Sequence, residues 1–527
     1  MITESAYSRF GGGGGGGGGF GGGGGGGHFG GGSHGGGSGG GSGSIVIMLI
    51  VLFVLVIFGL ISKQQNRKSS VLNKLPDEDI EDRKNEIEIY LKSNPDFNIE
   101  NFKTAKVKPA FIELQNAWAK KDVGIIRKYI SDGMYQRVAT QFRMMNLLDQ
   151  TNILDNLDVE NIVIDKIEQD GQYDIIHAAI QATIVDKYVS KKYPQFNSGG
   201  SEEFVEYWSF IRKKGIKEID LYSNDNCPNC GAALPKNLGE VSRCEFCKTI
   251  TNLGDYDWVL CEITQAEDYI NTSRKQSKSS ALASKVLEIS RSYNDFSVQN
   301  IEDKASNGFL QIISARALND VTLMRRFVSD ELFEKLKAIH GENIVYDRLY
   351  LNDVTLVGAL QADNKNILAI AVKYSFQRIK ITGDTATPID GFVTSKTEVM
   401  MMSRDIASQP AKGSLYAHVC PSCGGPVKDT IDTNCQFCGY LLNSTKNEWI
   451  VTDLLSVEEY RNHYDANKED YVENLDMNLV EGLYDVRDYA FNNILYIMAE
   501  DGEFAKEEMM MAVRLAKKWR NFRISDS

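Results

Sequence analysis

Eight of the nine cysteines in this chain form four Cys-x-x-Cys pairs, and the pairs fall into two groups. Thirteen residues separate the two pairs of the first group, and eleven separate those of the second. Two cysteines at this spacing can turn both sulfurs onto one ion, and four thiolates complete the closed tetrahedral site that Zn²⁺ prefers. We therefore predict two zinc centres. Their ligands are Cys227, Cys230, Cys244 and Cys247 in the first centre and Cys420, Cys423, Cys435 and Cys438 in the second.

Disulfides and iron–sulfur centres are the alternatives for this spacing, and disulfides require an oxidising compartment. A closed four-thiolate site leaves no ligand position for water, so the predicted role is structural and not catalytic. Glycine directly after the second cysteine of a pair helps the backbone turn its amides toward the sulfurs. Three of the four such positions hold glycine, whereas Lys248 departs from the pattern.

Each cysteine group is followed by the same aromatic spacing. A tryptophan lies eleven residues after the last cysteine, at Trp258 and at Trp449, and a tyrosine follows eleven residues later in both copies. This recurrence indicates a duplicated module. The apolar residues around Trp258 predict a strand with the tryptophan in the core. The ninth cysteine, Cys261, lies in this strand, and we interpret it as a buried inert thiol, with a reactive thiol as the alternative.

The duplication extends upstream, because residues 111–138 align without a gap on residues 309–336. Apolar residues recur there with helical spacing, and the segments that follow have strand spacing. The predicted fold class is α+β: two copies of helices, three strands, a cysteine ribbon and a further strand, with each ribbon inserted between the last two strands. Predicted strands cover 158–167, 173–185 and 203–212 in the first copy and 354–361, 367–380 and 397–404 in the second. Identical pairs include Phe111/Phe309, Ala117/Ala315, Asp122/Asp320, Val123/Val321, Arg127/Arg325, Ser131/Ser329 and Asp132/Asp330.

The first copy, with its helical residues, its Arg-Tyr-Ile-Ser-Asp sequence around Ser131 and its antiparallel strands, resembles the Tim-forty-four-like domain. This family includes the membrane-docking subunit of the mitochondrial protein-import motor and bacterial membrane proteins. The resemblance implies a cone-shaped domain with a curved antiparallel sheet, an apolar pocket, and scaffolding or lipid contact beside a membrane. The second copy departs from the pattern, since Arg316 replaces Trp118 and methionines 400–402 replace the strand around Trp208.

The N-terminal region predicts a membrane anchor. Residues 1–44 form a glycine-rich tract that cannot pack a core, and we predict that it is disordered. Residues 45–61 carry no charge, and we predict a transmembrane helix at 45–62. Lys63, Arg67 and Lys68 follow directly, so the tail is predicted outside the cell and the bulk of the chain in the cytoplasm. A charged, helical linker is predicted at 63–93.

The C-terminal residues 465–527 predict a small all-α domain. Its Ala-x-Asp-Gly-Glu sequence, followed by two further glutamates, is similar to the TerB-like module of tellurite-resistance proteins. Four acidic residues there are candidates for a hard cation, and an acidic helix N-terminus is the alternative interpretation. They are Asp501, Glu503, Glu507 and Glu508.

The predicted large domains span 94–270, with a ribbon at 224–255, and 280–460, with a ribbon at 416–446. The net charge is −13, and the two ribbons are nearly neutral, so nucleic acid is not an expected partner. No phosphate loop, nucleophile elbow or His-rich metal site stands in the sequence, and we expect no enzyme. The hypothesis is a single-pass, cytosol-facing scaffold that recruits proteins at the membrane, with structural zinc. The alternative is a lipid-binding or lipid-sensing protein that uses the pocket of the first domain.

Overall fold

A computed structural model describes residues 81–474, apart from 270–287, 339–343, 409–411, 428–430 and the single positions 237, 267, 290, 294, 295 and 392. The predicted glycine-rich tail, the predicted span at 45–62 and the acidic residues 501–508 lie outside the described residues. Among the helices of the described region, none combines the length and apolar character that a bilayer crossing requires.

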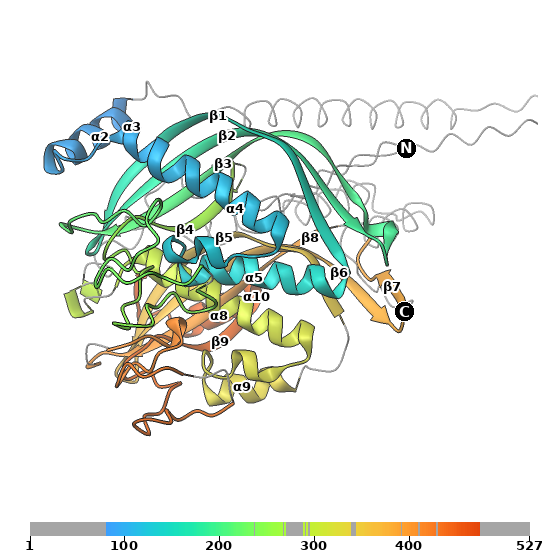
Figure 1. Ribbon diagram of the computed structural model, residues 1–527. Helices are drawn as coiled ribbons and strands as arrows, with labels where there is room; N and C mark the ends of the chain where they lie inside the picture. Colours follow the sequence, from blue (N-terminus) through green and yellow to red (C-terminus); the bar gives the residue numbers. More distant parts are fainter. Residues whose placement is uncertain are drawn as a thin grey trace, which may run out of the picture.

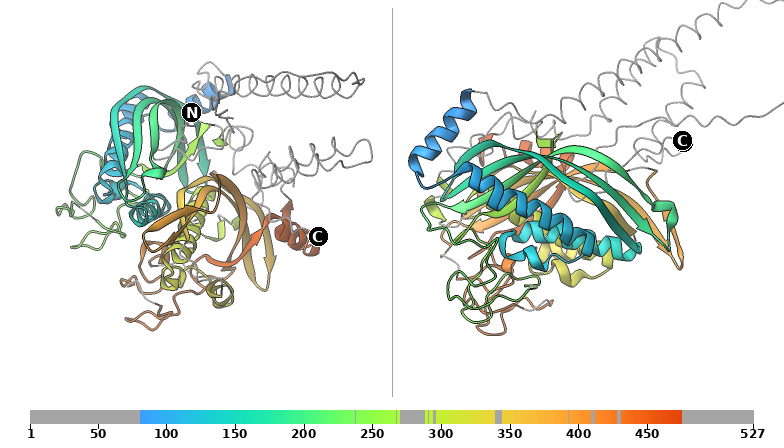
Figure 2. Two further views of the ribbon diagram at one scale, coloured as in Figure 1. Left: turned by 90° about the vertical axis from the view of Figure 1, so that its right-hand side faces the viewer. Right: turned by 45° about the horizontal axis from the view of Figure 1, so that its top comes forward.

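The chain forms two antiparallel sheets, each curved around its own helices (Figures 1 and 2). The mixed helix and sheet content agrees with the predicted α+β class and with a repeated domain. The first sheet has the strand order β1-β2-β3-β4. The elements of this first repeat are α2 (Glu81–Ser93), α3 (Ile99–Phe102), η1 (Lys103–Val107), α4 (Lys108–Lys120), η2 (Gly124–Tyr129), α5 (Asp132–Leu147), β1 (Gln150–Asp170), β2 (Tyr173–Ser190), η3 (Pro194–Phe196), β3 (Ser198–Lys213) and β4 (Val259–Gln265).

The second sheet has the order β10-β5-β6-β8-β9, with β7 paired to β6. It repeats the first sheet and adds an edge strand. The elements of this second repeat are α8 (Val298–Leu318), η4 (Val321–Met324), α9 (Asp330–Lys337), β5 (Ile344–Ala362), β6 (Lys365–Thr382), β7 (Thr385–Pro388), β8 (Thr394–Asp405), η5 (Leu415–Ala417), β9 (Ile450–Ser456), α10 (Val457–Ala466) and β10 (Tyr471–Asn474).

The two repeats share their irregularities as well as their strands. The first hairpin has register shifts at 155/158, 159/161 and 164/166, and the second has them at 347/350, 351/353 and 356/358. Each shift in the second repeat stands 192 residues after its counterpart. A bulge inserts a residue and increases the local twist, so conserved bulge positions give both sheets the same curvature.

Both ribbons are inserted where the sequence predicts. Strands β3 and β4 pair directly although residues 214–258 separate them, and β8 pairs with β9 across residues 406–449. Asp170 and Gly171 lie at the turn between β1 and β2, with Gly171 at a φ of 58°. All six predicted strands are present, and most of them are longer than the sequence pattern indicates.

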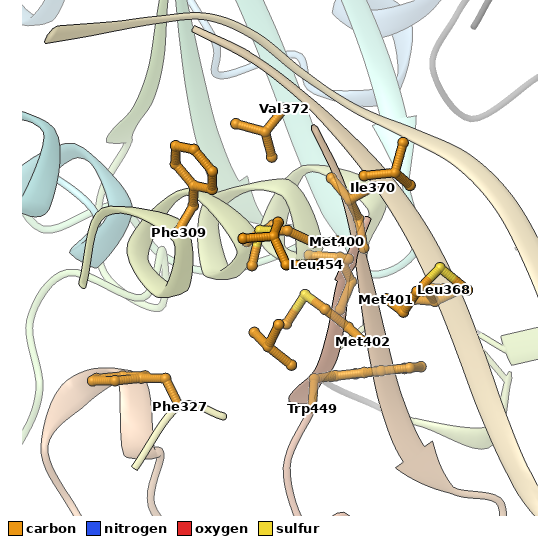
Figure 3. Packing of buried hydrophobic residues seen from close by; sticks show 14 of the residues in the cluster. Phe309, Phe327, Leu368, Ile370, Val372, Met400, Met401, Met402, Trp449 and Leu454 are labelled. Carbon is orange, nitrogen blue, oxygen red and sulfur yellow. The ribbon is translucent and has the colours of Figure 1, made fainter. Parts of the chain in front are cut away.

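Aromatic side chains fill the space between α4 and the first sheet. The rings of Phe111 and Trp208 lie 5.2 Å apart, as do those of Trp118 and Phe142. In the second repeat, Phe309 from α8 belongs to the same buried cluster as Met400 and Met402 from β8 (Figure 3). Methionine is flexible and fills the volume that aromatic rings fill in the first repeat.

The two repeats pack on each other through helices α5 and α8. The Arg137 guanidinium donates to Ser306 Oγ at 3.1 Å, and the hydroxyls of Thr140 and Ser314 lie 3.1 Å apart. The Tyr350 hydroxyl in β5 donates to the backbone oxygen of Ile263 at 3.0 Å. Directional hydrogen bonds between buried polar groups therefore cross this interface and help to fix the orientation of the repeats, beside a buried apolar cluster that contains residues of both repeats.

Two short segments outside the predicted limits of the large domains pack on the sheets of those domains. Helix α2 lies within the predicted linker, yet its Tyr90 is buried in the core of the first repeat and bonds Asp174 and Arg212. Residues 471–474 lie in the predicted all-α domain but form strand β10 beside β5. The first segment adds a buried side chain to a core, and the second adds a hydrogen-bonded strand to a sheet. Local periodicity does not predict either contact, because both partners are distant in sequence.

Candidate metal centres

Two groups of four cysteine sulfurs converge, one in each ribbon. All four sulfurs of each group lie within 4.8 Å of one another, and these groups could hold a metal ion. The Cys227 and Cys247 sulfurs lie 3.5 Å apart, and the Cys420 and Cys438 sulfurs lie 3.8 Å apart. A disulfide requires about 2.05 Å. Zinc–sulfur bonds of about 2.3 Å in a tetrahedron place the sulfurs about 3.8 Å apart, so the donor set fits a four-thiolate metal site.

The four Cys-x-x-Cys turns share one backbone conformation. In each turn the amide of the residue after the second cysteine donates to the carbonyl of the first, at 2.8–3.0 Å. The residue itself has a φ between 64° and 74°. Lys248 adopts this left-handed conformation although it has a side chain. Lys248 therefore has the same backbone geometry as the three glycines at the equivalent positions, although its residue type differs from theirs.

The thiols differ in exposure within each centre. The first cysteine of each pair is buried, whereas Cys230, Cys423 and Cys438 are exposed. Burial raises the pKa of Cys227 to about 12 and that of Cys420 to about 12. A cation that binds there must displace these protons, so metal affinity should rise with pH.

Three side chains at equivalent positions, an asparagine, an aspartate and an arginine that we call the clasp, connect each ribbon to its own repeat. Asn252 donates to the carbonyl of Ile130 at 2.9 Å and to Asp132 Oδ1 at 3.0 Å, and Arg127 bonds the same carboxylate. In the second repeat Asn443 and Arg325 reach Asp330 Oδ1 at 2.9 and 2.6 Å. The identical residues at these helix starts thus serve to hold the ribbons.

The tryptophans beside the ribbons belong to the core, as predicted. Trp258 and Trp449 are fully buried. A tyrosine before each ribbon bonds the tryptophan carbonyl: Tyr222 to Trp258 at 3.0 Å, and Tyr416 to Trp449 at 2.8 Å. Both ends of each ribbon are therefore anchored in the sheet, which limits the motion of the metal centre.

The two ribbons also contact each other, on one side of the molecule (Figure 1). Glu240 of the first ribbon lies 2.9 Å from His418 Nε2 of the second. Arg326 lies 2.6 Å from His418 Nδ1. Burial raises the pKa of Glu240, but the hydrogen bond from His418 and the positive charges nearby outweigh it and lower the pKa to about 2. His418 is buried. In the sequence it stands two residues before the ligand Cys420.

Aromatic side chains at the tips of both ribbons face solvent. Phe246 and Phe437 occupy the same position of the second Cys-x-x-Cys pair and are 73% and 62% exposed. No other phenylalanine is among the exposed large hydrophobic residues of the described region. Both rings are therefore available for contact with another molecule.

A second polar cluster, which the sequence does not reveal, lies on the first sheet. His177 Nδ1 is 2.8 Å from Ser209 Oγ, and Nε2 is 2.9 Å from Glu168 Oε1. The trio resembles a nucleophile, base and acid, but Ser209 and His177 are buried in paired strands. A nucleophile must be reached by its substrate, so we interpret the trio as a structural network. The register of three strands places Glu168, His177 and Ser209 on one face of the sheet, where they meet.

Cys261 is buried, and its thiol donates to the carbonyl of Ser209 at 3.2 Å. A register shift between β3 and β4 falls at Ser209 and Phe210, at the position where the thiol meets that carbonyl. The structure therefore agrees with a buried structural thiol.

The family model of the Tim44-like domain matches residues 86–224. This range runs from α2 to the start of the first ribbon, and such domains are known in membrane-associated proteins. No curated protein matches the chain. The family resemblance of the first repeat is thereby supported by an independent comparison.

Proposed function

We propose that this protein is a membrane-anchored, non-enzymatic scaffold whose two zinc ribbons together present a docking surface for cytosolic proteins. The observation that carries the proposal is the pair of ribbons, joined by Glu240 and His418, with Phe246 and Phe437 exposed at equivalent positions. The duplication preserved this exposed ring together with the metal ligands. A solvent-facing phenylalanine contributes nothing to the core, so contact with a partner accounts for it.

The composition of the ribbon surface favours a protein partner. The ribbons are nearly neutral, which disfavours nucleic acid and anionic headgroups as main targets. They also hold five of the eleven exposed large hydrophobic residues of the described region. Protein interfaces concentrate their binding free energy in a few such rigid apolar or aromatic anchors. The five residues are Phe246, Leu253, Ile431, Phe437 and Leu441.

The membrane part of the proposal rests on sequence and family. The uncharged run at 45–62 is long enough for one span, and the basic residues after it assign the bulk of the chain to the cytoplasm. The Tim44-like match agrees with a place beside a membrane. Tethering a body with two ribbons raises the local concentration of whatever binds them.

Zinc is the proposed metal because the donor set is four thiolates at tetrahedral spacing. Replacing the buried ligand, Cys227→Ser, should reduce the zinc content of the full-length protein from two ions to one and unfold the first ribbon. Metal analysis and proteolysis of the purified, reduced protein measure both effects. Unchanged zinc content would contradict the assignment of the first centre.

In-cell crosslinking of the full-length protein tests the scaffold. The native chain should yield a short set of crosslinked proteins, and a Phe246→Ser, Phe437→Ser double variant should lose them. Ile89→Ser is the matched control, because Ile89 is 64% exposed but lies on α2, away from the ribbons. This control should retain the same set.

Two outcomes would count against the proposal. Identical protein adducts from the native chain and from both variants would show that the partners do not bind through the exposed phenylalanines of the ribbons. Lipid adducts without enriched proteins would favour the lipid-binding alternative, in which the expected pocket of the first domain is the binding region.

A further inference from the structure

The contact between the two ribbons connects residues that stand close in sequence to a ligand of each metal centre. Glu240 stands four residues before the ligand Cys244, and its side chain reaches His418, two residues before the ligand Cys420. Arg326 Nη2 lies 2.6 Å from His418 Nδ1 and 3.2 Å from Nε2, so the guanidinium stands beside the ring that faces Glu240. The guanidinium also contacts the carbonyl of Val427 inside the second ribbon, at 3.5 Å.

Glu240 is itself held by the first repeat. Its backbone carbonyl accepts from Arg127 Nη2 at 2.9 Å, and its carboxylate accepts from Gln136 at 2.8 Å. Arg127 is the same residue that bonds Asp132 in the clasp of the first ribbon. Glu240 therefore attaches the loop between the two cysteine pairs of the first ribbon to the first repeat. The same residue also contacts the second ribbon.

The equivalent positions in the two repeats are used differently. Asp225 stands two residues before Cys227, as His418 does before Cys420, and Lys128 aligns with Arg326. Lys128 bonds Asp225 at 2.7 Å, but the Asp225 side chain is 87% exposed and the pair stays within the first repeat. In the second repeat the corresponding pair is buried and extends to the other ribbon. The bridge is thus a feature added to one copy of a duplicated site.

We propose that the two metal centres bind their ions cooperatively, and that Glu240 and His418 carry the coupling between them. Filling the second centre orders Cys420 and the chain before it, which holds His418 in place for Glu240. The loop that leads to Cys244 is then already positioned when the first centre fills. Coupling of this kind is reciprocal, so each filled centre raises the affinity of the other by the same factor. The inference rests on the metal centres of the proposed function.

Cobalt titration of the full-length, reduced, metal-free protein tests the coupling, since Co²⁺ bound by thiolates absorbs light and reports each filled site. Cys230→Ser disables the first centre and Cys423→Ser disables the second; both are exposed ligands at equivalent positions. Affinities come from competition with a chelator. If the centres are coupled, the overall two-ion constant of the native chain exceeds the product of the two single-site constants by about fivefold or more.

Glu240→Ala should bring this ratio close to one, and His418→Ala should do the same from the other ribbon. Asp225→Ala is the matched control, because it removes a carboxylate beside the first centre that does not reach the second ribbon; its ratio should equal that of the native chain. A native ratio of one would overturn the coupling while leaving two metal centres in place. Failure of the native chain to bind cobalt would overturn both the coupling and the metal centres.

Discussion

Lys248 shows how strongly the metal-binding turn constrains a single residue. Its φ of 64° lies in the left-handed region, where three glycines occupy the equivalent positions. A residue with a Cβ pays about 1–2 kcal/mol there, because the Cβ crowds the following carbonyl. The lysine ammonium donates to the carbonyl of Glu245 at 2.5 Å, a contact at the surface that offsets little of that cost.

Lys248→Gly should therefore stabilise the first ribbon. Relief of the backbone strain exceeds the extra entropy that glycine brings to the unfolded chain, and we expect a net gain of about 0.5–1 kcal/mol. Metal competition at the first centre in a Cys423→Ser background measures this gain as a tighter affinity. Lys248→Ala removes the same side chain but keeps the Cβ, and it should show no gain. An equal gain in both variants would attribute the effect to the lysine charge.

The ribbons are elements that depend on their hosts. Each ribbon is too small to bury a core, so the metal and the sheet must hold it. The clasp residue Asn252 satisfies two acceptors at the start of α5, the carbonyl of Ile130 and the carboxylate of Asp132. Because Ser131 also caps this helix through the amide of Met134, ribbon and helix share one anchoring point.

Asn252→Ala should loosen the first ribbon without removing its metal. The substitution removes two hydrogen bonds, one of them to a carboxylate, at a cost of about 1–3 kcal/mol. The Ile130 carbonyl keeps its hydrogen bond from Arg127. Hydrogen exchange should increase in residues 224–255 while metal content stays at two ions. Asn443→Ala gives the matched test, and its increase should be confined to residues 416–446. Loss of the ion from either variant would show that the clasp is part of the metal site and not only of the docking.

At the scale of the whole molecule, the repeats are joined by buried polar groups that include carboxylates. Asp170, at the tip of the first hairpin, accepts from the amide of Gln299 at the start of α8, at 2.9 Å. Burial raises the pKa of Asp170 to about 6, although two backbone amides at that helix start act in the opposite direction. A raised folded-state pKa means that the folded protein holds the proton more tightly than the unfolded chain. The contribution of Asp170 is favourable below pH 4 and is lost as the pH rises through about 6.

Asp170→Asn should consequently change the pH dependence of stability. Asparagine keeps the acceptor for Gln299 but cannot ionise, so the variant gains relative to the native chain between pH 5 and pH 8, by up to roughly 3 kcal/mol. Thermal unfolding of both proteins across this range measures the difference. Asp384→Asn is the control, since Asp384 pairs with Lys192 across the same interface but is 97% exposed. A difference between Asp170→Asn and native that does not vary with pH would contradict the assignment.

Local pattern was sufficient for much of this architecture. The Cys-x-x-Cys spacing predicts both ligand sets because two residues between thiols suit one ion, and the structure brings those eight sulfurs together. The repeat, the strand order within each copy and the ribbon insertion followed from periodicity and from identical residues at fixed offsets. The core position of Trp258 followed from its apolar neighbours. These features depend on residues close in sequence, or on a comparison of the chain with itself.

Contacts between distant segments were decided only by the tertiary structure. His418 and Glu240 are 178 residues apart and belong to different copies, so comparison of equivalent positions gives no sign that they meet. The hydrogen bonds of His177 depend on the register of three strands, and one residue of slippage would turn its partners to the other face. Tyr90 and strand β10 join sheets to which their local sequences do not assign them. Periodicity identifies which face of an element is apolar, whereas the packing of whole elements determines what that face meets.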